Sequence, residues 1–201
     1  MGFMKKSLFL FLFISFTTNC YGENLQLFEQ IVKKNPDSSE AHLKLGRAYQ
    51  KNNKPSKAIN SFKRSILLDQ GNETAHIFLG ELYYNQGTFD LASIHYKKAL
   101  TINRCASYYN HYANALTKND QMKPAIVSYK KAVLLDPKNP LFYYGLGYVY
   151  RKTGRYREYK KLSLKLNKID KDFGRKLKND SELFSKVSRL GAKSVKKKNT
   201  N

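Results

Sequence analysis

The chain has 201 residues, of which 41% are hydrophobic and 26% charged, and this balance excludes an intrinsically disordered protein. Its formal net charge of +22 favours association with something anionic, such as nucleic acid, an anionic membrane surface or an acidic protein. A solvated, lysine-rich surface explains the same charge without any ligand, and it is the simpler of the two interpretations.

The first 22 residues have the layout of a secretory signal peptide. Lys5 and Lys6 precede the apolar run Leu8–Phe16, and small and polar residues follow as far as Gly22. The apolar run is too short for a transmembrane helix, which needs about 20 residues. We therefore exclude residues 1–22 from the fold and expect the rest to be exported, to the periplasm or cell envelope or as a secreted protein.

The two cysteines predict no disulfide framework. Cleavage after Gly22 would leave a soluble chain with Cys105 alone, and we expect Cys105 to be a small packing residue. Alternatively, the stretch ending at Cys20 resembles a loose bacterial lipobox, in which Cys20 would be lipidated and anchor the protein. Thr17 and Asn19 depart from that pattern, and the sequence layout favours simple cleavage.

A lone helix is predicted over residues 24–36, where Leu25, Phe28, Ile31 and Val32 fall at helical spacing and Pro36 ends the pattern. It has the character of half a repeat, and we expect it to cover the open end of an array.

The rest of the chain repeats itself. The stretch Glu73–Leu100 predicts two helices and a tight turn, and its key residues recur 34 positions earlier. We predict helices over Glu40–Lys51 and Ser56–Leu68, with Asp37 capping the first and Asn72 and Asn139 capping later helices. The predicted repeats are residues 39–72, 73–105, 106–139 and 140–173.

These repeats resemble tetratricopeptide repeats. That family places Leu-Gly and an aromatic residue on the first helix, Gly in the turn, and Ala, an aromatic residue and Ala on the second. The resemblance implies an all-α, right-handed superhelical solenoid, and it departs from the family pattern at Tyr159 and Ser163, which suggests irregular packing of the last helix. The matching residues are Leu45-Gly46, Leu79-Gly80 and Leu146-Gly147, with Ala58, Ala92, Ala125, Phe62, Tyr96 and Tyr129.

The tail, residues 174–201, is not a repeat. Asp180 is placed to cap a helix that would seal the array, and a basic end follows. From Arg151 onward there are 18 Lys or Arg against 5 Asp or Glu, so an anionic membrane surface is a second candidate partner. Export argues against nucleic acid.

Catalytic chemistry is not indicated. The four histidines have no companions at metal-ligand or triad spacing, and the shared repeat position of His42 and His76 favours packing. The glycines form no phosphate-binding loop, so we expect no cofactor, metal or enzymatic activity.

Binding is the expected function, because the first helices of such an array line its concave face. We predict a scaffold of the cell envelope that binds an extended peptide or a helix of a partner protein. By resemblance, the groove residues that we single out are Arg47, Lys51, Glu81, Tyr84, Asn110, Asn114, Lys118, Tyr144, Tyr148 and Arg151. A solvated surface is the alternative for these side chains.

Overall fold

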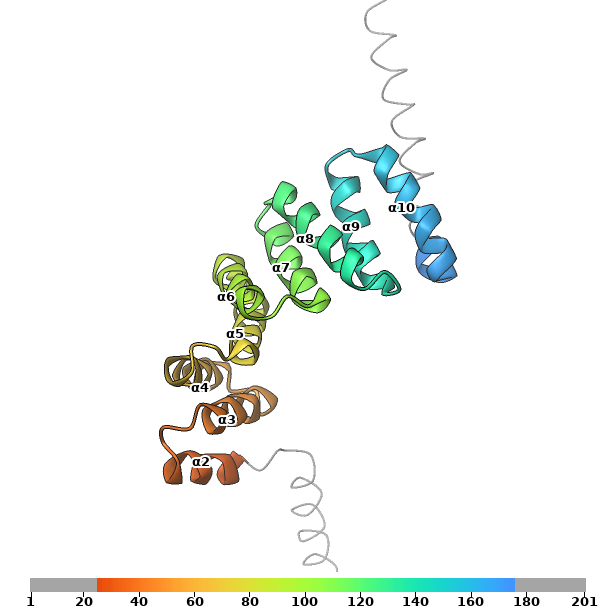
Figure 1. Ribbon diagram of the computed structural model, residues 1–201. Helices are drawn as coiled ribbons and strands as arrows, with labels where there is room; N and C mark the ends of the chain where they lie inside the picture. Colours follow the sequence, from red (N-terminus) through yellow and green to blue (C-terminus); the bar gives the residue numbers. More distant parts are fainter. Residues whose placement is uncertain (1–24, 176–201) are drawn as a thin grey trace, which may run out of the picture. The chain divides into compact units, whose positions relative to one another are not determined.

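The structure is a computed structural model, and it describes residues 25–175. This part of the chain is helical throughout, with helices α2 to α10 and no strand (Figure 1). It divides into two compact units, one ending at Ile102 and the other beginning at Asn103. The prediction of an all-α array of helix–turn–helix repeats is confirmed. The predicted signal peptide, Cys20 and Asp180 lie outside the described residues.

The first unit is a run of helices in which each packs on the next along the chain. The second helix of the first repeat also packs against the first helix of the second repeat, so apolar surface is buried between neighbours instead of in one central core. Its helices are α2 (Leu25–Lys34), α3 (Ser39–Lys51), α4 (Pro55–Leu68), α5 (Glu73–Asn85) and α6 (Phe89–Ile102).

The second unit consists of two further helix pairs. Here α8 packs against both α7 and α9, α9 also contacts α7, and α10 packs on α9. Tyr129, Tyr143, Tyr150 and Tyr159 are the largest side chains in its core. Its helices are α7 (Ala106–Lys118), α8 (Met122–Leu135), α9 (Pro140–Lys152) and α10 (Tyr156–Ile169).

Glycine allows the two helices of a repeat to approach closely. A Cβ atom added at Gly46 would lie 2.5 Å from the ring of Phe62, and one added at Gly80 would lie 2.7 Å from the ring of Tyr96. Both rings are almost fully buried. The missing side chain is therefore what makes room for the aromatic residue of the second helix.

Helix α2 packs on α3, as the prediction for an end-covering helix requires. None of its residues is fully buried, and the half-buried ones are the predicted apolar positions Leu25, Phe28, Ile31 and Val32. The Tyr49 hydroxyl on α3 donates a hydrogen bond of 2.8 Å to the Glu29 carboxylate on α2. A single shallow apolar face and one polar bond thus hold this helix.

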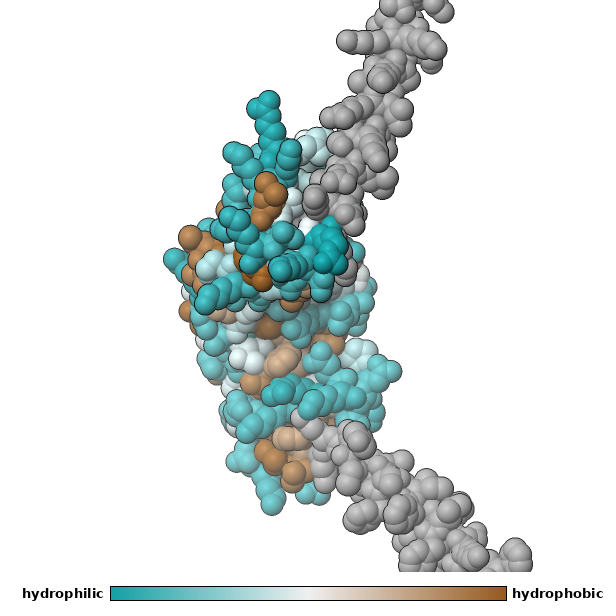
Figure 2. Space-filling model, turned by 90° about the vertical axis from the view of Figure 1, so that its right-hand side faces the viewer, coloured by the Kyte–Doolittle hydropathy of each residue, from teal (hydrophilic) through white to brown (hydrophobic). Residues whose placement is uncertain are grey.

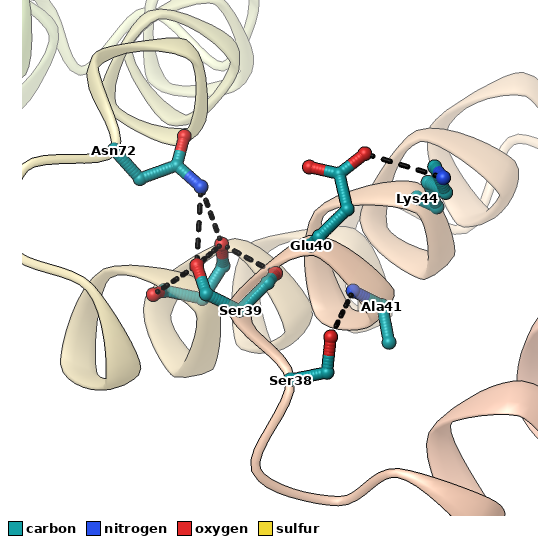
Figure 3. Close-up of polar contacts among 7 residues, drawn as sticks. Ser38, Ser39, Glu40, Ala41, Lys44 and Asn72 are labelled. Atoms are coloured by element: carbon teal, nitrogen blue, oxygen red, sulfur yellow. Dashed lines mark hydrogen bonds and ion pairs between the residues drawn. The ribbon is translucent and has the colours of Figure 1, made fainter.

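Polar groups join the first two repeats where α5 begins (Figure 3). The Asn72 carbonyl accepts from the Ala75 N–H at 2.9 Å and so caps α5, which confirms that prediction. The Asn72 amide nitrogen donates to the hydroxyls of Ser39 and Ser65, both at 3.1 Å. Each serine hydroxyl also lies within 3.0 Å of the backbone carbonyl of the other serine.

Two local predictions about α3 and α4 were wrong by one residue. The side chain that caps α3 is Ser38, whose hydroxyl accepts from the Ala41 N–H at 3.2 Å, and not Asp37 (Figure 3). Asp37 instead pairs with Arg64 at 3.3 Å. Pro55 is the first residue of α4 and not part of the turn, because proline is compatible with the first helical position.

The last repeat keeps an ordered second helix despite its unusual residues. Tyr159 and Ser163 of α10 are both buried, so a large ring at the alanine position accompanies a small side chain at the aromatic position. After α10, the Asp170 carboxylate accepts from the N–H groups of Asp172 and Phe173, and helix resumes at residue 171.

Candidate functional site

In the first unit, Arg47 and Lys51 lie exposed on α3. The Arg47 guanidinium is 5.3 Å from the centre of the Phe78 ring on α5, which in turn stacks on Phe62 at 5.5 Å. A cation–π contact of this kind restrains a long side chain without neutralising its charge. Arg47 is therefore a positioned cation on the surface formed by α3 and α5.

Glu81 and Tyr84 come from α5 of the same unit, and both are half-buried. Burial raises the pKa of the Glu81 carboxyl above its ordinary value, and it raises the pKa of the Tyr84 hydroxyl as well. The Tyr84 ring meets Phe89 edge-on at 5.2 Å. A partly desolvated carboxylate gains more than a solvated one from a cationic or N–H donor of a ligand.

In the second unit, Asn110 and Asn114 are half-buried on α7, and Lys118 is exposed at its end. The Tyr129 hydroxyl donates a hydrogen bond of 2.6 Å to the Asn114 side-chain carbonyl. This bond fixes the orientation of the amide, because only its oxygen can accept. The Asn114 NH₂ group takes no part in this bond and is the donor that the side chain can offer to another acceptor.

Two tyrosines on α9 complete the second set. Tyr144 is 43% exposed and Tyr148 is 42% exposed, one helical turn apart on the same face. The Arg151 guanidinium lies 5.7 Å from the centre of the Tyr148 ring, and Tyr144 meets Phe173 edge-on at 5.8 Å. Exposed rings of this size present flat apolar surface that water solvates poorly.

The structure thus places the predicted groove residues in two local sets. Arg47, Lys51, Glu81 and Tyr84 share the first unit, whereas the other six share α7 and α9 of the second. Elsewhere, exposed hydrophobic side chains are scattered, and on the face in Figure 2 hydrophobic residues form small separate patches among hydrophilic ones. Scattered exposure of this kind needs no functional explanation.

The packing role predicted for His42 and His76 fits His76, which is buried, better than it fits His42. His76 is buried, and its Nδ1 lies 3.1 Å from Nδ1 of His95 on α6. His42 is only half-buried and bonds the Pro36 carbonyl through Nε2 at 2.9 Å. The pairing of His76 with His95 was missed, although both fall within one predicted repeat.

Cys105 is not the packing residue that the sequence suggested. It precedes α7, is half-exposed, and its Sγ lies 3.2 Å from the Ser107 hydroxyl. No group of three or more metal-ligating side chains occurs in the region the structure describes. Among residues 25–175, none of the helices combines the length and the hydrophobicity that a transmembrane span requires.

Comparison with known proteins agrees with the helix pairs. Models of tetratricopeptide repeats match residues 43–110 and 141–173, and a TPR repeat model matches residues 113–154. The chain matches no curated protein by sequence.

Solved structures share the fold. MamA is 22% identical, with a TM-score of 0.70 over 79% of this chain and 87% of that one. MamA from Desulfovibrio magneticus RS-1 is 16% identical, with a TM-score of 0.70 over 80% and 94%. YrrB, described as a TPR protein with an unusual peptide-binding site, is 18% identical, with a TM-score of 0.65 over 71% and 74%. The repeat-model matches, together with this shared fold, show that the chain belongs to the tetratricopeptide repeat family.

Proposed function

We propose that the protein is a non-enzymatic scaffold that binds an extended segment of a partner protein on the first-helix surface of its repeats. The observation on which this rests is the Asn114 amide oriented on α7, together with two exposed tyrosines, Tyr144 and Tyr148, on α9, a helix that contacts α7. The peptide-binding site named for YrrB, which shares the fold, supports a ligand of the same class.

The chemistry of this surface suits a peptide backbone. The Asn114 NH₂ group can donate to a backbone carbonyl, which is the acceptor that an extended peptide offers at every residue. The rings of Tyr144 and Tyr148 offer apolar faces for side chains of the same peptide. Arg151, positioned over Tyr148, can pair with a carboxylate of the partner.

The first unit offers a second contact surface with different charges. Arg47 is held over Phe78, and the half-buried Glu81 is a candidate acceptor for a lysine, an arginine or an N–H group of the partner. Binding by both sets would require a partner segment that carries acidic and basic residues.

Export to the cell envelope is part of the proposal, and it rests on the layout of residues 1–22. The alternative partner, an anionic membrane surface, depends on the basic region from Arg151 onward. Between residues 151 and 175 there are ten Lys or Arg against three Asp or Glu. Several of these cations are engaged within the protein, for example Lys152 with Asp120 and Arg155 with Glu158. We therefore favour a protein partner.

The test is selection of peptides from a displayed random library against the purified chain, followed by measurement of affinity for the selected peptide. We expect Asn114→Ala and Tyr148→Ala each to weaken binding by about ten-fold, since each removes one central contact. Lys161→Gln, an exposed change on α10 outside the predicted groove, is the matched control and should leave affinity within two-fold.

Two results would contradict the proposal. One is that no peptide is enriched while anionic vesicles bind the chain. The other is that a selected peptide binds equally well to the Asn114→Ala and Tyr148→Ala variants, because the binding surface would then lie elsewhere. Circular dichroism of each variant checks that its helices remain intact.

A further inference from the structure

A cavity of about 390 Å³ in the first unit lies outside the predicted groove residues. Its walls come from the second helix of the first repeat, from the connection that follows it, and from both helices of the second repeat. None of its lining residues belongs to the groove sets described above. The lining residues are Lys63, Ile66, Leu67, Gln70, His76 and Lys98.

Every ionisable group that lines this cavity is basic. Lys63 of α4 and Lys98 of α6 come from different repeats and border the same space. In the part of the chain that the structure describes, neither ammonium group forms an ion pair with a carboxylate. Two like charges that border one space without a counter-charge repel each other, so an anion between them would be favoured.

The wall of the cavity strengthens this preference. The His76 ring lines the cavity. Its Nδ1 atom forms a hydrogen bond of 3.1 Å with Nδ1 of His95. Burial is the main cause that lowers the pKa of both histidines; the charge of Lys98 adds to it at His76, and His76 and Lys63 add to it at His95. The charged side chains that line the cavity are therefore all cations, and the Gln70 amide adds a neutral donor.

We propose that this cavity is a binding site for a phosphate group, held between Lys63 and Lys98. Phosphate offers several strong acceptor oxygens, which match two ammonium groups, an imidazole and an amide. The cavity is larger than a single phosphate ion, and Ile66 and Leu67 give it an apolar side. Leu67 is 67% exposed, so an organic group attached to the phosphate would cover surface that water otherwise contacts.

The test is a titration of the full chain with inorganic phosphate, followed through the imidazole NMR signals of His76 and His95. Saturable shifts of both histidines, with raised pKa values in the bound state, are expected because a bound anion favours the protonated ring. The double variant Lys63→Gln/Lys98→Gln should lose at least about ten-fold in affinity. Lys97→Gln, an exposed change next to Lys98 that does not line the cavity, should keep affinity within two-fold.

A parallel titration with glycerol phosphate distinguishes the source of the group. Tighter binding of the ester would assign the site to a phosphorylated organic molecule that uses the apolar side, whereas equal binding would assign it to free phosphate. The proposal fails if the shifts follow ionic strength alone, as a chloride titration would reveal. It also fails if the folded double variant binds phosphate as well as the unaltered chain.

Discussion

Replacement of Asn72 by alanine should destabilise the first unit more than the loss of a helix cap alone. The side chain accepts one hydrogen bond from the Ala75 N–H and donates two, to the Ser39 and Ser65 hydroxyls. Loss of a cap costs about 1 kcal/mol, and each of the other two bonds contributes about 1 kcal/mol. Because Asn72 is only half-buried, water can replace part of the lost hydrogen bonding. We therefore expect Asn72→Ala to lower the free energy of unfolding by about 2 to 3 kcal/mol.

Asn139 provides a matched control at the same repeat position. It caps α9 by accepting from the Leu141 N–H at 3.1 Å, so Asn139→Ala should cost only about 1 kcal/mol. Amide hydrogen exchange, followed separately in α5 and α9, measures both losses because local opening reports local stability. If Asn72→Ala costs α5 no more than Asn139→Ala costs α9, the two serine bonds contribute nothing and the reasoning is refuted.

Three further predictions concern packing, pH and the binding surface. Gly80→Ala should cost about 1 to 3 kcal/mol in urea unfolding, because the new Cβ would lie 2.7 Å from the Tyr96 ring; an unchanged midpoint would contradict it. Burial, with the charges of neighbouring groups, lowers the pKa of His95 from 6.5 to about 4, so the unfolded chain takes up this proton first. The corresponding stability is fully present above pH 6.5 and is lost as the pH falls towards 4, by about 1 to 2 kcal/mol after allowance for solvent screening. Unfolding measured across this range should show a shallower slope in His95→Gln, while His76 and His111, whose pKa values are also lowered, keep their contributions. Tyr129→Phe should weaken peptide binding by about three- to ten-fold while the fold remains intact, because the Asn114 amide loses its orienting bond.

The fold could be predicted from the sequence because each repeat states the same local pattern again. Glycine or alanine opposite an aromatic residue, at a period of about 34, specifies a helix pair through packing between near neighbours. Asn72 and Asn139 were identifiable as caps because each stands directly before a periodic apolar stretch. In a repeat array, the residues that specify each helix are also those that pack it against its neighbours.

Side-chain contacts between residues far apart in the sequence are where the sequence-based prediction failed. Asp37 and Ser38 have nearly equal preference for the capping position, and the choice of Ser38 accompanies an ion pair of Asp37 with the distant Arg64. Lys63 and Lys98, which border one cavity, are 35 residues apart on two second helices. No period or motif marks such a pair, because side-chain directions across a repeat junction depend on how neighbouring helices cross.

The central predicted groove residues are Arg47, Glu81, Asn114 and Tyr148, each directly after the Gly or Ala of the repeat pattern on the first helix of its repeat. Their surroundings differ with the aromatic residue of the second helix. The buried second-helix aromatic residue interacts with the central groove residue in the second and third repeats, whereas in the first repeat it contacts the ring over which that residue lies. Phe62 has no hydroxyl, and Arg47 instead lies over Phe78, which stacks on Phe62. In the second repeat, burial raises the pKa of the Tyr96 hydroxyl, and the charge of Glu81 raises it further.

In the third repeat, the Tyr129 hydroxyl bonds the Asn114 amide directly. Gly145 on α9 stands at the position of Phe78, and an added Cβ there would collide with the Tyr129 ring. In the fourth repeat, the aromatic is replaced by Ser163, and the central groove residue is itself a ring, the half-exposed Tyr148. In the third repeat a core side chain thus orients a predicted groove residue, so a substitution of Tyr129 would release the Asn114 amide without removing any group that a ligand would contact.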